Sequence, residues 1–383
     1  MHVLMIPSWY PEKADGFSGS FFREQAEAFI SEGHAVGVLV VRGIPIYQYG
    51  DYKQRAQRGT YQSEGDVNVF RADALMPVPK LHPINLASLE KRWLQLFKTY
   101  VSRFGRPDVL NAHAMFPAGI VASRISRKTG IPFVITEHRP SSIDLLRSPG
   151  YRGPALRAAK EAKGLVAVAK GFAPELNEAY RTDKWEYLPG LLSPQFEDLP
   201  VRTPPTGPFV FGHVSHLDPG KRVDLLIDAF GDAFGSDNTV RLRIAGDSAH
   251  RVGLEKLVKE RGLSNVDFVG AVSREHIAKE FSRYHSFVLT SEKEAFGTVL
   301  WEAMACGLPI VSTDTWAGKN AVSRITGLMT PIDDRKALAA TLQEMQTKFS
   351  EFDPLAIRYF CVDHCGRKSF VNHYMGLYNR GTI

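Results

Sequence analysis

Residues 291–313 read Ser-Glu-Lys-Glu-Ala-Phe-Gly-Thr-Val-Leu-Trp-Glu-Ala-Met-Ala-Cys-Gly-Leu-Pro-Ile-Val-Ser-Thr, and this stretch decides the fold. Two of its three carboxylates, Glu294 and Glu302, are separated by seven residues, with Gly297 between them. The pattern predicts a tight loop, a helix that begins near Gly297, and a following β-branched strand. The first turn of such a helix leaves backbone N–H groups unpaired, and these groups attract anions. The two carboxylates can therefore flank a ligand whose phosphates lie at the helix N-terminus, and a nucleoside diphosphate sugar has that form.

The same stretch resembles the E-x7-E motif of the GT4 family of retaining glycosyltransferases. The resemblance runs from Met1 to about Leu342 and includes several separate motifs in the family's order. It implies the α/β architecture called GT-B, in which two Rossmann-like domains face a central cleft. The alternative interpretation is that Glu294 and Glu302 are ordinary solvated carboxylates on a surface helix.

Strand-like and helix-like runs alternate through the chain, which favours parallel α/β sheets. Four prolines fall within residues 199–208, where neither a helix nor a central strand can continue, so we place an interdomain linker there. By the resemblance, residues 1–195 form an acceptor-binding domain and residues 196–368 form a nucleotide-sugar-binding domain. A helix within residues 369–383 is then expected to pack back on the first domain.

The bulk composition is that of an ordinary soluble protein of two domains, with 383 residues, 44% hydrophobic and 23% charged. No apolar run approaches the roughly 20 residues that cross a bilayer. The opening residues 1–8 predict a buried strand and no signal peptide, so we expect a cytoplasmic protein. The three cysteines, Cys306, Cys361 and Cys365, predict neither a disulfide framework nor a zinc quartet.

The charge is unevenly distributed along the chain. Residues 1–195 contain 25 basic and 18 acidic side chains, a balance of +7, although the whole chain carries only +6. A basic first half indicates an anionic partner. The candidates are nucleic acid and the negatively charged inner leaflet of a membrane.

In the second half, the resemblance aligns a diphosphate-binding loop with residues 212–224. The family's arginine position is His216, its lysine is kept as Lys221, and Arg222 replaces the usual glycine. Fixed cations are needed there because the leaving diphosphate gains charge in the transition state. Glu294 is expected to bind sugar hydroxyls and Glu302 the ribose diol. Further donor contacts are expected from Gly246, Val269, Gly270, Phe296, Gly297 and Thr298.

In the first half, four segments are candidates for ligand contact. Gly16 and Gly19 would let the first loop approach a phosphate, or they form a plain βα turn. Trp9 and Tyr10 would line an acceptor pocket, or they pack under that loop. By the resemblance, His113 hydrogen-bonds the donor sugar, where the alternative is a structural histidine. The segment Thr136-Glu137-His138 resembles the family's Thr-x-His, and Glu137 or His138 is expected to contact the acceptor.

Together these motifs predict a retaining glycosyltransferase that moves a sugar from a nucleoside diphosphate sugar, with a UDP-sugar as the expected donor, to a glycan or lipid-linked glycan. The expected setting is surface polysaccharide biosynthesis, and the expected catalytic residues are His113, Lys221, Arg222 and Glu294. The sequence has no Asp-x-Asp, so we expect no metal and no other cofactor. The alternatives are a nucleotide-sugar epimerase or a phosphorylase on the same fold, and a basic nucleic-acid-binding protein. No nucleic-acid-binding motif supports the last.

Residues 86–104 predict a basic amphipathic helix. Its positively charged positions are Lys91, Arg92, Lys98 and Arg103. Such a helix either lies on the inner face of the cell membrane, near a lipid-linked acceptor, or packs on a core with its charged face in solvent. The apolar positions on its other face are Leu86, Leu89, Trp93, Leu96, Phe97 and Tyr100.

Overall fold

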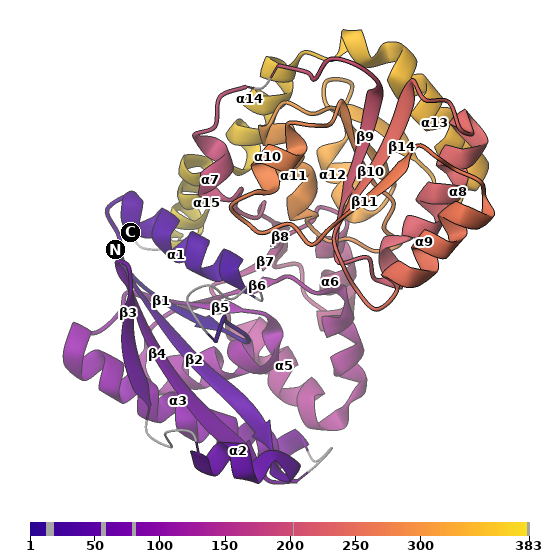
Figure 1. Ribbon diagram of the computed structural model, residues 1–383. Helices are drawn as coiled ribbons and strands as arrows, with labels where there is room; N and C mark the ends of the chain where they lie inside the picture. Colours follow the sequence, from indigo (N-terminus) through magenta and orange to yellow (C-terminus); the bar gives the residue numbers. More distant parts are fainter. Residues whose placement is uncertain (13–18, 55–58, 79–81, 202, 381–383) are drawn as a thin grey trace. The chain divides into compact units, whose positions relative to one another are not determined.

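The structure is a computed structural model that describes residues 1–12, 19–54, 59–78, 82–201 and 203–380 (Figure 1). They form two units, one of Met1–Leu191 with Phe370–Ile383 and the other of Leu192–Ser369. The chain passes between the units ahead of the proline-rich residues 199–208, so the linker expected there lies within the second unit. The reason is that Phe196 is already buried, with its ring 6.0 Å from that of Phe281.

The first unit has an eight-stranded sheet in the order β3-β4-β2-β1-β5-β6-β7-β8. Neighbouring strands are parallel except for the antiparallel β3–β4 pair. Nearly every side chain of β1, β5, β6 and β7 is buried, as is typical of parallel strands that helices cover on both faces. The strands are β1 (His2–Pro7), β2 (Ala35–Pro45), β3 (Thr60–Glu64), β4 (Val67–Met76), β5 (Val109–His113), β6 (Phe133–Glu137), β7 (Gly164–Ala167) and β8 (Trp185–Tyr187).

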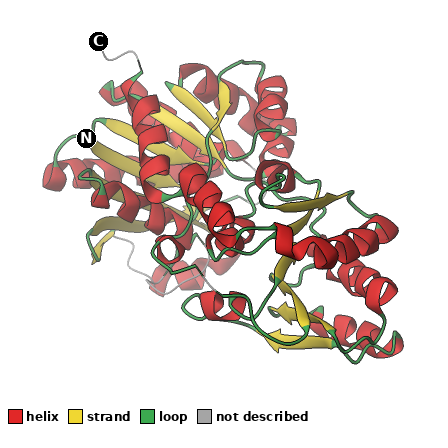
Figure 2. Ribbon diagram, turned by 90° about the horizontal axis from the view of Figure 1, so that it is seen from above, coloured by secondary structure: helices red, strands yellow, loops and turns green. Residues whose placement is uncertain are grey.

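Helices cover both faces of this sheet (Figure 2). On β2, Val36 and Val38 belong to the core beneath α1, whereas Gly37 and Leu39 face α3. This alternation follows from the two-residue period of a strand. The helical segments are α1 (Ser20–Ser31), η1 (Ile46–Gln48), α2 (Tyr49–Gln54), α3 (His82–Phe104), η2 (Met115–Gly119), α4 (Ile120–Thr129), η3 (Pro140–Arg147), α5 (Pro149–Glu161), α6 (Phe172–Tyr180) and α15 (Arg367–Asn379).

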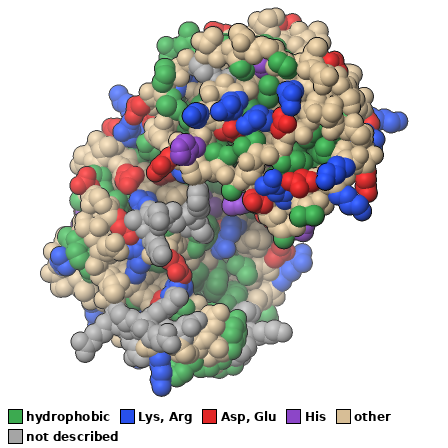
Figure 3. Space-filling model, in the orientation of Figure 1, with side chains coloured by type: hydrophobic (Ala, Val, Ile, Leu, Met, Phe, Trp, Pro, Cys, Tyr) green, Lys and Arg blue, Asp and Glu red, His purple; other side chains and the backbone are tan. Residues whose placement is uncertain are grey.

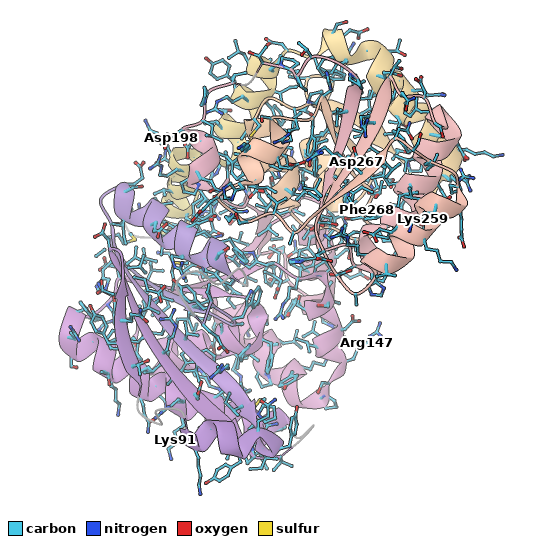
Figure 4. All side chains as sticks on the ribbon, viewed as in Figure 1. Lys91, Arg147, Asp198, Lys259, Asp267 and Phe268 are labelled. Atoms are coloured by element: carbon cyan, nitrogen blue, oxygen red, sulfur yellow. The ribbon has the colours of Figure 1, made fainter. Side chains whose placement is uncertain are left out.

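Helix α3 is the basic amphipathic segment, and its apolar side is part of the core. Leu86, Leu89, Trp93, Leu96, Phe97 and Tyr100 are all buried. Arg92 donates from Nε to the Asp73 carbonyl at 3.1 Å, and the Arg103 guanidinium lies 3.7 Å from the centre of the Tyr61 ring. Lys91 projects outward (Figure 4). The structure therefore supports the core-packed interpretation of this helix, because these six apolar side chains are buried in the core.

Helix α15 carries five aromatic or aliphatic side chains into the core of the first unit: Phe370, Val371, Tyr374, Leu377 and Tyr378. The rings of Phe370, Tyr374 and Tyr378 lie about 6 Å from that of Phe29 on α1. The Tyr374 hydroxyl is 3.0 Å from Thr136 Oγ1 on β6, and the Lys163 ammonium donates to the Tyr378 carbonyl.

The second unit has a six-stranded parallel sheet in the order β11-β10-β9-β12-β13-β14. Phe211 on β9 faces the core under α8 and α13, and the next residue, Gly212, faces Tyr284 on the opposite side. The strands are β9 (Phe209–Val214), β10 (Val240–Ala245), β11 (Val266–Gly270), β12 (Ser286–Leu289), β13 (Ile310–Thr313) and β14 (Gly327–Thr330). The helical segments are α7 (Pro194–Glu197), η4 (Pro219–Lys221), α8 (Val223–Phe234), α9 (Arg251–Glu260), α10 (Ile277–Phe281), α11 (Thr298–Ala305), α12 (Trp316–Ala321), α13 (Arg335–Lys348), η5 (Phe349–Glu351) and α14 (Pro354–Cys365).

Basic and acidic side chains lie side by side on the face of the second unit that Figure 3 displays. Ion pairs in the second unit include Arg241 with Asp267 at 2.9 Å and Arg243 with Glu280 at 2.7 Å. Within the part of the chain that the structure describes, no helix combines the length and apolar character needed to span a bilayer.

Candidate functional site

The E-x7-E stretch forms the loop after β12 and the N-terminus of α11. Gly297 precedes the helix with φ 67° and ψ 55°, and a Cβ there would lie 2.8 Å from the Ala317 Cβ. Only glycine combines this left-handed backbone with so close a neighbour. The helix therefore begins at Thr298, as the sequence predicts, and the N-terminus of a helix favours negative charge.

Lys221 and Glu294 form an ion pair beside this helix end. The lysine Nζ lies 2.5 Å from Glu294 Oε2, and the side chains are 29% and 21% exposed. Two hydrogen bonds fix the loops that carry them, because Thr290 Oγ1 donates to the Lys221 carbonyl and the Glu292 N–H donates to the Gly220 carbonyl. A cation and a carboxylate, both partly open to solvent, are thus held next to a helix N-terminus.

Arg222 occupies a left-handed position, with φ 49° and ψ 44°. This backbone explains why the family pattern has glycine there, since other residues rarely adopt it. The guanidinium pairs with Asp224 at 3.2 Å, with Glu292 at 3.3 Å and with Asp333. These contacts raise the pKa of Arg222 and hold its side chain among three carboxylates. The structure therefore indicates that Arg222 links the loops that carry these carboxylates. The sequence had led us to expect a contact with the diphosphate instead.

The ends of β9, β10 and β11 bring another group of predicted donor contacts together. Gly246 has φ 136°, and a Cβ there would overlap the Ser215 carbonyl oxygen at 1.8 Å. Its N–H donates to the Gly270 carbonyl at 2.8 Å, and Val269 lies just before Gly270 at the end of β11. His216 follows Ser215 and is exposed.

His213, which the sequence interpretation overlooked, fixes the conformation of the loop that contains Ser215 and Leu217. Its Nδ1–H donates to the Val288 carbonyl at 2.9 Å, and its Nε2 lies 2.8 Å from Ser215 Oγ, which in turn accepts from the Leu217 N–H. Burial lowers the pKa of His213 to about 4, so the ring is neutral and can make both contacts at neutral pH.

Glu302 is 3% exposed and forms an ion pair with Arg274, a second residue that the sequence interpretation overlooked. Arg274 Nη1 lies 2.6 Å from Glu302 Oε1. On the same helix, Trp301 donates from Nε1 to the Phe296 carbonyl at 3.1 Å, and the two rings stack at 5.5 Å. Phe296 therefore supports the helix start through its backbone and its ring.

In the first unit, His113 and His138 lie in contact at the ends of β5 and β6. His113 Nδ1 is 3.1 Å from His138 Nε2, and the ring of Phe22 packs 4.7 Å from His113 and 5.4 Å from His138. The rings of Trp9 and Phe22 also pack together, with their centres 5.1 Å apart. The Arg139 guanidinium lies 4.4 Å from the centre of the Trp9 ring. The geometry thus supports the packing interpretation of Trp9.

The Glu137 carboxylate is wholly buried and accepts three backbone N–H groups. These come from Met115, His138 and Arg139, at 2.9, 3.0 and 3.1 Å. Burial raises the pKa of Glu137, and the three hydrogen bonds oppose that shift. Its oxygens hold the loops after β5 and β6, which differs from the acceptor contact expected for this side chain.

Tyr10 and Gly19 belong to the first loop, whereas Gly16 lies outside the described residues. Gly19 has φ 82°, and a Cβ there would lie 3.0 Å from the Trp9 ring. Tyr10 lies against a hollow of about 230 Å³ that Arg42, Arg71 and Asp73 also line. Burial, with the Glu64 carboxylate adding to it, raises the pKa of Tyr10 to about 12.

The histidine pair predicts a loss of stability in acid. Burial lowers the pKa of His113 well below its usual value and that of His138 to about 3. Below pH 6.5 the unfolded histidines bind protons that the folded ones exclude, so the free energy of unfolding falls as the pH decreases from about 6.5 towards 3, by up to ~1.4 kcal/mol per pH unit for each ring.

Urea unfolding of the wild type and of His138→Gln between pH 7.5 and 4.5 measures this effect. In the variant the free energy of unfolding should fall less steeply with decreasing pH, because about one proton fewer is taken up on unfolding. His373→Gln, an exposed site on α15, serves as the control. Equal declines in the wild type and His138→Gln would contradict the prediction.

Among the described residues no cluster of three or more His, Cys, Asp or Glu side chains is arranged to hold a metal ion. Cys361 and Cys365 are buried on α14 with their sulfur atoms 3.9 Å apart.

Comparisons with known proteins place each half of the chain in a described family. Residues 18–190 match the model of "Glycosyltransferase Family 4", and residues 195–348 match that of "Glycosyl transferases group 1". An uncharacterized glycosyltransferase of Methanocaldococcus jannaschii is 25% identical over 62% of this chain and 65% of its own length. The matched part of this chain spans less than two thirds of the length of each of the first curated relatives.

Longer matches exist at similar identity. A putative teichuronic acid biosynthesis glycosyltransferase of Bacillus subtilis is 24% identical over 89% of this chain and 88% of its own length. Among solved structures, HepE of Anabaena in complex with UDP superposes with a TM-score of 0.70, at 18% identity, over 98% of this chain and 99% of that one. This likeness shows the fold.

Proposed function

The chain belongs to the GT4-type glycosyltransferases, which have the GT-B fold, and on that premise we propose that it transfers a sugar from a nucleoside diphosphate sugar with retention of configuration. A UDP-sugar is the proposed donor and a glycan or lipid-linked glycan the proposed acceptor. Surface polysaccharide synthesis is the proposed setting, and the relative named for teichuronic acid biosynthesis supports it.

The ion pair between Lys221 and Glu294 at the N-terminus of α11 carries this proposal. A diphosphate at that helix end would meet the backbone N–H groups of α11 and the Lys221 ammonium, and both favour negative charge. Glu294, 2.5 Å from the ammonium, would accept hydrogen bonds from hydroxyls of the sugar attached to that diphosphate.

The chemistry then depends on charge stabilisation and positioning. As the bond between the sugar and the diphosphate breaks, negative charge grows on the leaving phosphate, where Lys221 and the helix end are already in place. The acceptor's proton can pass to that leaving oxygen on the same face of the sugar, which retains the configuration. We propose that no metal is required, because the lysine and helix dipole supply the positive charge.

Thermal unfolding with a panel of UDP, GDP, ADP, CMP and dTDP tests the proposal. A nucleotide at a hundred times its dissociation constant should add about 2.7 kcal/mol to the free energy of unfolding. Stabilisation by one nucleotide, lost in Glu302→Ala and kept in the exposed control Glu344→Ala, would support it. Absence of any shift in the wild type would overturn it.

We also propose that the protein reaches a lipid-linked acceptor by binding an anionic membrane through electrostatic attraction alone. The apolar side of α3 is buried and cannot insert into the bilayer. Vesicles with anionic lipid should bind the protein at low salt and release it at high salt. Flotation with neutral vesicles is the control. Binding that persists at high salt, or no binding at low salt, would contradict this prediction.

A further inference from the structure

The buried carboxylate of Glu302 is held by a residue from a different element. Glu302 lies within α11, whereas Arg274 lies in the connection between β11 and α10. The distance from Arg274 Nη1 to Glu302 Oε1 is 2.6 Å, and the two side chains are 33% and 4% exposed. A carboxylate this buried requires a partner, because leaving it ionised and unpaired would be costly.

The position of Arg274 is itself fixed by neighbours in the second unit. Gln195 donates from Nε2 to the Arg274 carbonyl at 3.3 Å, and the guanidinium lies 5.9 Å from the centre of the Phe196 ring. The same connection begins at Gly270, whose carbonyl accepts from the Gly246 N–H. Arg274 therefore links the end of β11, where Val269 and Gly270 are expected to contact the donor, to the Glu302 carboxylate, which is expected to bind the ribose diol.

We propose that Arg274 is a positioning residue that makes the site selective for ribose over 2′-deoxyribose, an inference that rests on the proposed function. A carboxylate has two oxygens and about four acceptor positions. With its Oε1 beside the Arg274 guanidinium, the carboxylate is held in one orientation, in which a bound ribose would place its 2′- and 3′-hydroxyls against it. Hydrogen bonds to an ionised group are stronger and more directional than neutral ones.

The selectivity has an expected size. A nucleotide that lacks the 2′-hydroxyl leaves this buried acceptor unmatched, which should weaken binding by about 10- to 100-fold. Without Arg274 the carboxylate can rotate away from this orientation, so UDP should bind more weakly while the binding of 2′-deoxy-UDP changes little. The ratio of the two dissociation constants should then fall to within about threefold of unity.

Calorimetric titration of UDP and 2′-deoxy-UDP into the wild type, Arg274→Met and Arg274→Lys tests the inference. Methionine keeps the length of the side chain without its charge, and lysine should restore part of the ratio. Arg283→Met is a matched control, because Arg283 also pairs with a buried carboxylate, that of Glu280, at 3.6 Å. The thermal unfolding of all variants, followed in parallel, separates a local effect from misfolding.

The outcomes are distinct. A wild-type ratio of tenfold or more that collapses in Arg274→Met and persists in Arg283→Met supports the inference. A ratio unchanged in Arg274→Met, or tighter UDP binding to that variant than to the wild type, overturns it, the second result meaning that Arg274 occupies the ribose position. If the wild type binds neither nucleotide nor any other of the panel, the proposed function itself fails.

Discussion

Replacing Lys221 by alanine is expected to lower kcat by about 10²- to 10³-fold, the usual cost of removing one preorganised group that stabilises charge in a transition state. The ammonium lies at the N-terminus of α11, 2.5 Å from Glu294, where a leaving diphosphate would gain charge. Because the lysine is partly exposed, its loss should change stability little. The rate should therefore fall without a comparable fall in the unfolding temperature.

The measurement is the release of nucleoside diphosphate from the nucleotide sugar that the wild type consumes, at saturating donor. Lys259→Ala is the control, since Lys259 projects from α9 into solvent (Figure 4). A Lys221→Ala variant with kcat within a few-fold of wild type would remove this residue from the proposed mechanism.

Replacing Trp301 by alanine is expected to cost about 3–5 kcal/mol in free energy of unfolding, the range for deleting a buried aromatic side chain. Trp301 is fully buried on α11, and its ring stacks on those of Phe296 at 5.5 Å and His364 at 4.8 Å. Its Nε1–H also donates to the carbonyl of Phe296, which is next to Gly297 at the start of α11. The substitution should thus destabilise the second unit and loosen the start of α11.

Chemical denaturation followed by circular dichroism measures this cost. Trp301→Phe should lose much less, because it keeps a ring in the stack, and Tyr359→Ala, at a site 70% exposed, should stay within about 0.5 kcal/mol of wild type. A Trp301→Ala variant as stable as Tyr359→Ala would show that the ring stack contributes little to stability.

The sequence predicted the elements whose local pattern and tertiary context agree. Gly297 marked the start of α11 because only glycine takes its backbone conformation, and the alternating apolar runs predicted the parallel strands except β14. The family resemblance is confirmed by the matches over both halves of the chain. Lys221 and Glu294 were each expected to contact the donor, but the ion pair between them was not predicted.

Other features depended on partners far along the chain, which no local pattern reveals. Arg222 looked like a substitute for a phosphate-binding arginine, but Asp333, more than a hundred residues later, pairs with it. Glu137 was expected to contact the acceptor, but in the fold its carboxylate accepts a hydrogen bond from the Met115 N–H. Strand β3 was missed because its sequence is polar and it pairs only with β4 at the sheet edge. Arg274 lies in no recognisable motif.

The return of α15 to the first unit has a consequence for synthesis. A ribosome delivers residues 1–191 long before it delivers Phe370, Tyr374 and Tyr378, and the whole second unit emerges in between. Until then the hydrophobic surface around Phe29 lacks the helix that covers it in the finished protein. The nascent first unit should consequently be a client for chaperones, and truncation before Phe370 should yield an aggregation-prone product even though it removes no residue of the proposed site.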